Sequence, residues 1–397
     1  MTTNPTWHRD THLIREGVQR TENLETSEAL FLTSGYVYDS AEQAAAAFKG
    51  EVDNFIYSRY GNPTLKALED RLAKLEGAEA CRACGTGMAA IFSSLACQLS
   101  AGDRVVASRA LFGACHAILT KILPRWGIDV ELVDGRDQTA WERALQVPTK
   151  IVFLESPSNP VLHLVDIQAV SKLAHAAGAL VIVDNVFATP VHQSPLALGA
   201  DIVTYSTTKH IDGQGRLLGG AVLGKKAFIE DVFLPFYRQT GAAMSPFNAW
   251  VMLKSLETLS LRVDAQTKTA TKIAAVVKTH PAVLSLSYPG DDSHPQYELA
   301  CRQMSGSGTL MAFEIEGGRD GAFRFLNALS LIDISNNLGD AKSLACHPAS
   351  TTHMNLSEED RAALEIYEGH VRLSVGLEHS DDLIADVMQA LDLCSGR

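Results

Sequence analysis

The chain has 397 residues, of which 46% are hydrophobic and 20% charged, a composition typical of a soluble globular protein of about two to three domains. The net charge of −12 argues against nucleic-acid binding, because phosphate contacts depend on clustered lysine and arginine. No apolar run reaches the length of about 18 residues that a membrane-spanning helix needs, and the N-terminal MTTNPTWHRDTHLIREG has no apolar segment typical of a secretory signal. We therefore expect no membrane association and a cytoplasmic location.

Cysteine usage predicts neither disulfides nor a metal site. The seven cysteines are odd in number and scattered along the chain. Cys81 and Cys84 form one CxxC pair, which could be redox-active or half of a zinc site, but no second pair at ligand spacing accompanies it. Buried free thiols are the favoured interpretation.

Residues 1–60 are predicted to form an arm rather than a domain, because strong hydrophobic periodicity is lacking there. Within the arm, a short helix is predicted over Ala41–Lys49. After the arm, a second helix is predicted from an N-cap at Thr64 to about Leu75.

Residues 61–255 are predicted to form a large α/β domain with a mostly parallel sheet, because strand and helix patterns alternate. The predicted strands are Arg104–Ala107, Val130–Val133, Ile151–Leu154, Leu180–Val183, Ile202–Tyr205 and Ala221–Leu223, with helices at Trp141–Leu145 and Ile167–Ala176.

Residues 256–397 are predicted to form a smaller α+β domain. A strong helical pattern over Phe247–Leu261 leads into it, with a long connecting helix predicted to reach His280. The other predicted elements are strands at Leu310–Ile315 and Val371–Ser374 and helices at Gly321–Leu329, Glu358–Ala363 and Ser380–Cys394.

Two predicted strands end in residues that suggest a cofactor. The apolar run Ala179–Val183 ends at Asp184, and Asp201–Tyr205 leads to Lys209. Ligands in open parallel sheets lie beyond the carboxyl ends of the strands. A lysine can form a Schiff base with a carbonyl, and pyridoxal phosphate needs that lysine and an acid that keeps its ring nitrogen protonated. The sequence therefore predicts a pyridoxal-phosphate site at this sheet edge.

A phosphate site is also predicted. The stretch Cys84–Ala90 opens a helix with two glycines, and free backbone N–H groups at a helix start attract anions. Ser206 and Thr208 could donate hydroxyl hydrogen bonds to the same phosphate, Arg59 could add charge and Tyr57 a phenol donor. The helix start alone is equally consistent with a tight turn, and each of the other residues alone favours a structural role. Together with Asp184 and Lys209 they favour one phosphorylated ring.

Two further residues carry a functional and a structural interpretation. Phe112 could stack on a flat cofactor ring or fill the core. Arg372 lies in an alternating apolar strand and needs a partner, which is either a buried carboxylate or the α-carboxylate of an amino-acid substrate. The substrate is favoured once the cofactor is accepted. His347 and His353 have no carboxylate or cysteine to complete a metal set, so they are predicted to line a loop.

Several motifs resemble the Cys/Met-metabolism family of pyridoxal-phosphate enzymes, which includes cystathionine γ-synthase, cystathionine lyases, methionine γ-lyase and homoserine-ester sulfhydrylases. They occur in the family's order over nearly the whole chain, and they are Tyr57-Ser-Arg59-Tyr-Gly-Asn-Pro63-Thr64, Glu155-Ser-Pro-Ser-Asn159-Pro160, Asp184-Asn185, Ser206-Thr-Thr208-Lys209 and Arg372-Leu-Ser-Val-Gly-Leu-Glu378. The resemblance implies an aspartate-aminotransferase-like (fold type I) transferase that works as a homotetramer, a dimer of dimers with shared active sites.

The resemblance also implies a role for each site residue. Lys209 is expected to hold pyridoxal 5′-phosphate as a covalent Schiff base and to act as the catalytic base, with Asp184 at the pyridine nitrogen and Asn159 near the 3-hydroxyl. The expected phosphate ligands are Gly87, Met88, Ser206 and Thr208, joined by Tyr57 and Arg59 reaching from the neighbouring subunit. The expected substrate ligands are Arg372, Asn337 and Thr352.

One departure from the family guides the choice of reaction. The family usually has Leu-Tyr-Gly where this chain has Leu111-Phe112-Gly113, and that tyrosine is credited with protonating the leaving group in lyases. Phe112 can stack on the ring but cannot move a proton. A carboxylate leaving group needs less protonation than a thiol, which favours γ-replacement on a homoserine ester. Ala114 also replaces the cysteine that methionine γ-lyases tend to carry.

The stretches Asn337–Ser343 and His347–His353 look most like the sulfhydrylase branch. We therefore expect conversion of O-succinylhomoserine and sulfide to homocysteine and succinate, in methionine biosynthesis. Open alternatives are cystathionine γ-synthase with cysteine as acceptor, an O-acetylhomoserine sulfhydrylase and a methionine γ-lyase. A pyridoxal-phosphate-binding regulator is disfavoured because the acidic chain has no spare length for a DNA-binding module, and an NAD-dependent oxidoreductase because no G-x-G-x-x-G follows a first strand.

Overall fold

The computed structural model describes residues 7–394, so the first six residues of the predicted arm and the last three of the predicted C-terminal domain lie outside it. The chain divides into two compact units. The first comprises residues up to Gln98, Thr204–Asp212 and Arg216–Thr258, and the second comprises Leu99–Val203, Gly213–Gly215 and the chain from Leu259 onward. Among the described residues, no helix combines the length and apolarity required to cross a membrane.

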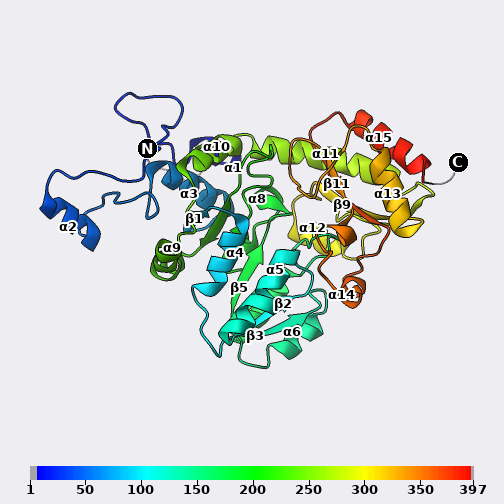
Figure 1. Ribbon diagram of the computed structural model, residues 1–397, viewed down its shortest axis with the longest axis horizontal. Coiled ribbons are helices and arrows are strands. Elements are labelled where there is room, and N and C mark those ends of the chain that lie inside the picture. The colour runs from blue at the N-terminus through cyan, green and yellow to red at the C-terminus, as the bar shows by residue number, and fades with distance from the viewer. Residues whose placement is uncertain (1–6, 395–397) are drawn as a thin grey trace. The chain divides into compact units, whose positions relative to one another are not determined.

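The first unit carries helices around an antiparallel strand pair (Figure 1). Its elements are α1 (Arg9–Arg15), α2 (Ala41–Lys49), α3 (Pro63–Glu76), β1 (Ala80–Cys84), α4 (Gly87–Ala96), β7 (Gly220–Gly224), η4 (Phe228–Phe233), α9 (Leu234–Thr240) and α10 (Pro246–Leu256). The pairing of β1 with β7 runs from Ala80 opposite Gly224 to Cys84 opposite Gly220. Helix α3 packs against both β1 and α10.

Helix α2 has the predicted bounds, but the predicted N-cap of α3 is wrong. The cap is Asn62, whose side-chain oxygen accepts from the Thr64 backbone N–H at 2.9 Å. The helix begins at Pro63, because proline has a helical φ and its missing N–H costs nothing in the first turn. Thr64 instead uses its hydroxyl oxygen to accept from the backbone N–H of Phe31 at 2.9 Å, which ties the N-terminal arm to α3.

The CxxC pair lies on β1, where Cys81 and Cys84 are three positions apart and so point to opposite faces of the strand. Both thiols are free and buried, and burial raises the pKa of each. The prediction of plain buried thiols is confirmed.

The second unit contains a parallel sheet in which β3, β2, β4 and β5 follow one another. The elements from Leu99 to Val203 are β2 (Arg104–Ser108), α5 (Gly113–Ala117), η1 (Ile118–Ile122), η2 (Leu123–Trp126), β3 (Asp129–Val133), α6 (Gln138–Ala144), β4 (Ile151–Glu155), α7 (Ile167–Ala176), β5 (Leu180–Asp184), α8 (Thr189–His192), η3 (Pro195–Leu198) and the start of β6 (Ile202–Tyr205). The predicted strands are confirmed to within a residue at each end. Strand β6 begins in this unit and ends in the first.

A second sheet in the same unit has the order β10-β11-β12-β9-β8 and is mostly antiparallel. The elements from Leu259 onward are α11 (Leu259–Val277), β8 (Val283–Ser287), α12 (Tyr297–Gln303), β9 (Leu310–Ile315), α13 (Gly318–Ala328), β10 (Asp333–Ile334), β11 (Leu344–Cys346), η5 (Pro348–Ser350), α14 (Glu358–Ala363), β12 (His370–Ser374) and α15 (Ser380–Asp392). The predicted continuous helix over 247–261 is wrong, because α10 ends at Leu256 and α11 begins at Leu259.

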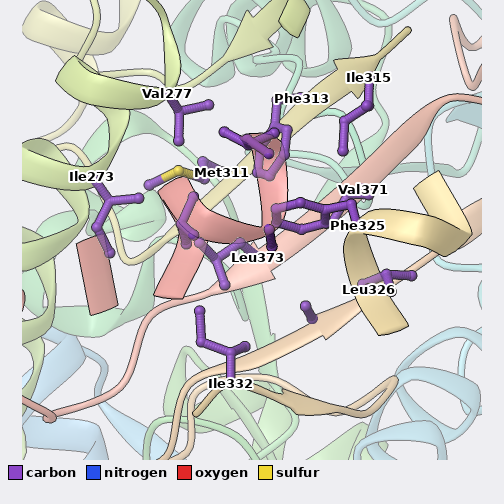
Figure 2. Packing of buried hydrophobic residues seen from close by; sticks show 14 of the residues in the cluster. Ile273, Val277, Met311, Phe313, Ile315, Phe325, Leu326, Ile332, Val371 and Leu373 are labelled. Atoms are coloured by element: carbon purple, nitrogen blue, oxygen red, sulfur yellow. The ribbon is translucent and has the colours of Figure 1, made fainter. Parts of the chain in front are cut away.

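The core of this part lies between the second sheet and helices α11, α13 and α15 (Figure 2). Met311 and Phe313 alternate along β9 and point into it, and Phe313 meets the ring of Phe325 edge-on at 5.5 Å. On the neighbouring strand β12, Val371 and Leu373 are buried in the same core. The alternation places Arg372, between these two residues, on the opposite face of the sheet.

Candidate active site

A tight contact lies at the start of α4 in the first unit, where the sequence predicts an anion site. The Thr86 hydroxyl caps the helix by accepting from the Ala89 N–H at 3.0 Å. Gly87 follows it, and a Cβ there would lie 2.6 Å from the Cβ of Ser206, so only glycine allows this approach. The N–H groups of Gly87 and Met88 belong to the first helical turn, which has no intrahelical acceptor for them. The predicted ligands Gly87, Met88 and Ser206 therefore come together.

Ser206, Thr208 and Lys209 share one turn after β6. The Lys209 backbone N–H donates to the Ser206 carbonyl at 3.2 Å. The Thr208 hydroxyl accepts from the Gly219 N–H at 3.0 Å and donates to the Gly219 carbonyl at 3.3 Å, so both of its contacts are to the segment before β7. The Lys209 side chain is half-buried. Two residues predicted to bind phosphate and the predicted Schiff-base lysine thus lie within one short segment.

Tyr57 and Arg59 lie in a separate cluster of the first unit. The Arg59 guanidinium is 5.5 Å from the Tyr57 ring centroid and donates to the Arg238 carbonyl. Tyr57 is 43% exposed. Their predicted reach to a neighbouring subunit's phosphate stays a prediction.

In the second unit, two carboxylates end neighbouring strands. Glu155 at the end of β4 is the register partner of Asp184 at the end of β5, and both are buried. Burial raises the pKa of Asp184 to about 7. Burial and the Asp184 charge raise the pKa of Glu155 well above its ordinary value. The pair therefore carries one negative charge more readily than two.

Glu155 fixes the backbone around the site, a role that the sequence analysis missed. Its two side-chain oxygens accept from the backbone N–H of Phe112 at 2.8 Å and of Asn159 at 2.9 Å. The Asn159 side-chain oxygen in turn accepts from Nη1 of Arg372 at 2.9 Å. The sequence does contain a signal for this role, because Glu155 directly follows an apolar strand, as Asp184 does.

Arg372 is 1% exposed and is held by neutral groups. Besides Asn159, its Nη2 donates to the carbonyls of Asn336 at 2.9 Å and Asn337 at 3.2 Å. Within residues 7–394, no carboxylate forms an ion pair with it, and its buried Nε has no hydrogen-bond partner. Burying a guanidinium in this way is costly unless an anion compensates it, so the site fits a substrate carboxylate.

Phe112 and Thr352 border a pocket of about 580 Å³ in the second unit, whose lining includes Asn336 and His347. A Cβ on Gly113 would lie 2.9 Å from the Thr352 carbonyl oxygen, so the loop that carries Phe112 packs closely on Thr352. The Thr352 hydroxyl pairs with the His353 ring at 2.8 Å. Asn337 reaches Arg372 through its backbone carbonyl.

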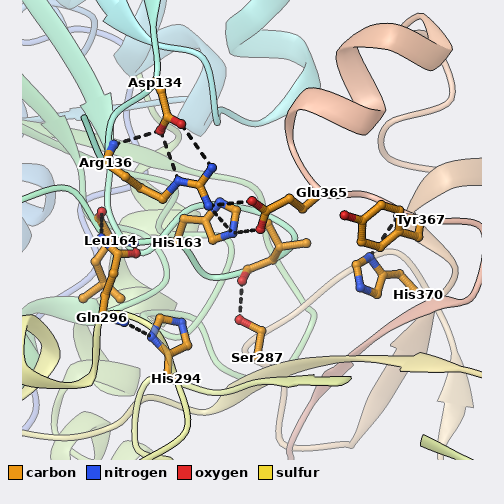
Figure 3. A network of polar contacts seen from close by, with 11 residues as sticks. Asp134, Arg136, His163, Leu164, Ser287, His294, Gln296, Glu365, Tyr367 and His370 are labelled. Atoms are coloured by element: carbon orange, nitrogen blue, oxygen red, sulfur yellow. Dashed lines mark hydrogen bonds and ion pairs between the residues drawn. The ribbon is translucent and has the colours of Figure 1, made fainter. Parts of the chain in front are cut away.

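A polar network braces the loop that follows Asn159 (Figure 3). Arg136 donates to Glu365 at 2.8 Å, and the other Glu365 oxygen pairs with the His163 ring at 3.0 Å. Burial, together with the Arg136 charge, lowers the pKa of His163. The network joins the chain just after Asn159 to the segment that leads into β12, and so supports the residues on either side of the Arg372 contact.

These features fit pyridoxal phosphate. Gly87 leaves space at a helix start for a phosphate, where a side chain would collide with Ser206. Asp184 is a buried acid that can hold a pyridine nitrogen protonated, and the unpartnered Nε of Arg372 suits an amino-acid carboxylate.

Comparisons with known proteins agree with this assignment. The family model described as Cys/Met metabolism PLP-dependent enzyme matches residues 10–392. An O-succinylhomoserine sulfhydrylase of Mycobacterium tuberculosis is 55% identical over 95% of this chain and 94% of its own length. An L-methionine gamma-lyase of Treponema denticola is 44% identical over 91% of each chain. A similar solved structure is that of a putative O-acetylhomoserine (thiol)-lyase from Campylobacter jejuni, which contains a pyridoxyl-lysine monophosphate residue. The two structures superimpose with a TM-score of 0.94 at 32% sequence identity, over 97% of this chain and 100% of that one. The predicted fold-type-I α/β architecture is confirmed.

Gly87→Ala is expected to weaken pyridoxal-phosphate binding at least about tenfold, because the new methyl group would displace Ser206 from the helix start. Titration of the cofactor into cofactor-free protein measures this. Gly35→Ala is the control, since a Cβ there meets nothing within 4 Å. Equal affinity in the two variants would contradict the proposed cradle.

Glu155→Gln is expected to weaken binding of an amino-acid substrate by about 10- to 100-fold, because the amide NH₂ cannot accept from Phe112 or Asn159 and leaves one buried donor unpaired. The absorbance change of the bound cofactor on adding substrate measures the affinity. The exposed Glu142→Gln on α6 controls for loss of a charge. An unchanged affinity would show that Glu155 does not position Asn159.

Asp184 is expected to make the cofactor-free protein less stable as pH rises from about 4 to about 7. In this window the unfolded carboxyl ionises near its ordinary value of 3.8, while the folded one keeps its proton until about pH 7. The free energy of unfolding of Asp184→Asn should therefore rise relative to wild type across this window and level off above it. Urea unfolding at several pH values measures the difference, with exposed Asp53→Asn as control. If the free energies of unfolding of wild type and Asp184→Asn depended on pH in the same way, the raised pKa of Asp184 would be contradicted.

Proposed function

Because the chain belongs to the Cys/Met metabolism family of pyridoxal-phosphate-dependent enzymes, we propose that it replaces the γ-substituent of O-succinylhomoserine with sulfide, giving homocysteine and succinate. The reaction type is inferred from Phe112. Glu155 fixes the backbone of this residue, and its side chain has no ionisable hydrogen to give to a leaving group. The relative named O-succinylhomoserine sulfhydrylase, at 55% identity, supports the choice of ester and acceptor.

When bound, pyridoxal phosphate supplies an electron sink for the carbanion formed next to the substrate amine. Lys209 would hold it covalently, and Asp184 would keep the ring nitrogen protonated. The helix start at Gly87 and Met88, with the Ser206 and Thr208 hydroxyls, would bind the phosphate. Since the Asn159 side-chain oxygen is occupied by Arg372, its amide nitrogen would face the 3-oxygen of the ring.

Arg372 would bind the substrate α-carboxylate through Nε, with Asn337 and Thr352 contributing to the substrate site. The Lys209 amine would be the base that removes the proton from Cα and later from Cβ. The same amine returns protons to these carbons after sulfide has added at Cγ.

The leaving group explains why a phenylalanine suffices at position 112. Succinate leaves from Cγ as a carboxylate whose conjugate acid has a pKa near 4, so no proton donor is needed. A thiolate leaving group, with a pKa near 8.5 for its conjugate acid, gains more from protonation. The same argument disfavours methionine γ-lyase activity. Cystathionine γ-synthase and O-acetylhomoserine sulfhydrylase are the remaining alternatives, and a regulator without activity is a distant one.

We further propose that the chain forms a homotetramer, a dimer of dimers, in the cytoplasm. Tyr57 and Arg59 would then serve a neighbouring subunit's cofactor phosphate. The exposure of Tyr57 and of the arm residues around it is compatible with a surface that a second copy covers.

Product analysis tests the proposed reaction. Holo-protein given O-succinylhomoserine and sulfide is expected to form homocysteine, with little cystathionine when cysteine replaces sulfide, because Phe112 and the sulfhydrylase-like loops favour that branch. Lys209→Ala is the control, and its turnover should fall by more than about 1,000-fold, since it lacks the base. Chromatography of the amino-acid products measures both.

Three other outcomes identify the alternatives. Cystathionine as the main product from cysteine would make the protein a synthase. Predominant 2-oxobutyrate, whichever nucleophile is present, would show that elimination does not need a tyrosine at position 112. Turnover by Lys209→Ala near the wild-type rate would contradict the proposed mechanism.

A further inference from the structure

A buried histidine of the second unit contacts a residue that lines the pocket beside Phe112. His353 is 1% exposed, and its Nδ1 lies 2.8 Å from the hydroxyl oxygen of Thr352. Thr352 is half-buried and borders the pocket of about 580 Å³, as Phe112 does. The ring can therefore orient a hydroxyl that faces a ligand in this pocket.

The surroundings of the ring indicate which nitrogen carries the hydrogen. The backbone carbonyls of Asn159 and Leu111 lie near enough to the ring to favour its charged form, and a carbonyl oxygen can only accept. Within residues 7–394 the buried Nε2 has no close hydrogen-bond partner, so a hydrogen on this atom is what the two carbonyls can use. Burial, followed by the Arg372 charge, lowers the pKa of His353 to about 4, so the ring is neutral at neutral pH. A neutral ring with its hydrogen on Nε2 has a bare Nδ1, and the Thr352 hydroxyl therefore donates to it.

The direction of this hydrogen bond decides what Thr352 can bind. A hydroxyl has one hydrogen, and Thr352 gives it to the histidine, so only lone pairs face the pocket. Two groups are exchanged at Cγ in the proposed reaction. The departing succinate offers carboxylate oxygens, which are acceptors as well, whereas the incoming sulfide offers an S–H bond, which is a weak donor. The pair of residues therefore suits the nucleophile rather than the leaving group.

The pocket adjoins the proposed site of the substrate α-carboxylate. Asn336 lines it, and the Asn336 carbonyl accepts from Nη2 of Arg372 at 2.9 Å. A Cβ on Gly113 would lie 2.9 Å from the Thr352 carbonyl oxygen, so Thr352 also packs against the loop that carries Phe112. These residues all belong to the second unit. A substrate held by Arg372 would thus have the Thr352 hydroxyl in the pocket next to it.

We propose that the Thr352 hydroxyl, oriented by His353, binds the incoming sulfide through its S–H group. This inference rests on the proposed function and extends it to the second substrate. Hydrogen sulfide and hydrosulfide both have an S–H hydrogen for this contact, and a lone pair of the sulfur stays free to form the bond to Cγ. Thr352 would touch the nucleophile, whereas His353 is a positioning residue that acts through Thr352.

Steady-state kinetics in which sulfide and O-succinylhomoserine are varied separately test this contact. Thr352→Val replaces the hydroxyl by a methyl group and is expected to raise KM for sulfide about 3- to 10-fold, because one neutral hydrogen bond is lost. KM for the ester should change less than about twofold, because the ester does not use this hydroxyl. Thr352→Ser keeps the hydroxyl and should stay near wild type. Thr139→Val, at an exposed position on α6, is the control.

A double-mutant cycle tests the part played by His353. His353→Phe removes the nitrogen that accepts from Thr352, so the freed hydrogen can turn into the pocket and KM for sulfide should rise in this variant too. In the double variant with Thr352→Val the two effects should not add, because both act on one hydroxyl. Additive rises in KM for sulfide would overturn the role of His353.

The two KM values also identify the results that overturn the proposed contact. If Thr352→Val raises KM for the ester as much as KM for sulfide, the hydroxyl serves the ester and the inference is overturned. Unchanged KM for both substrates overturns it too. A wild type that forms no homocysteine from O-succinylhomoserine and sulfide defeats the proposed function and this inference together, whereas an active wild type with an unaffected Thr352→Val defeats the inference alone. If Thr352→Val does not fold, the ratio of the two KM values for His353→Phe decides in the same way.

Discussion

The candidate site in the second unit depends on one buried carboxylate that accepts two backbone hydrogen bonds. Glu155 fixes the loop of Phe112 with one oxygen and the start of the Asn159 loop with the other, and Asn159 then orients Arg372. Burying this carboxylate is costly, since burial and the neighbouring Asp184 charge both oppose its ionisation. The hydrogen bonds that offset this cost hold together three segments far apart in sequence, which carry Phe112, Asn159 and Arg372. The arrangement is typical of sites in which preorganisation matters more than local stability.

The helix start in the first unit, where the phosphate is proposed to bind, depends on close packing. Gly87 lies so close to Ser206 that it could not carry a side chain, and Gly220 is similarly confined by the Thr86 carbonyl. A phosphate at a helix start gains from several N–H groups at once, but only if the neighbouring chain can come near. The glycines make this possible, at the cost of extra conformational entropy lost on folding.

Much of this architecture could be predicted from the sequence, because buried parallel strands have continuous apolar runs that end in polar residues. Strands β2, β4 and β5 and the residue Asp184 follow that rule. Strand β1 does not, since its small and polar residues ACRAC carry no such signal. The break between α10 and α11 falls where the apolar pattern continues, so that only the backbone shows it. Glu155 could be seen to follow a strand, but its partners are backbone N–H groups, which leave no trace in the sequence.

The buried thiols have a consequence for an enzyme that handles sulfide. Five of the seven cysteines are buried, and burial raises the pKa of those at positions 81, 84 and 394. Cys115 gains a further rise from the nearby Asp184 and Glu155 charges. Because the thiolate is the species that attacks disulfides and oxidised sulfur, these side chains are poor acceptors for persulfide or mixed-disulfide formation. The buried thiols are therefore protected from reactive sulfur, whereas Cys301 is exposed and Cys97 is only partly buried.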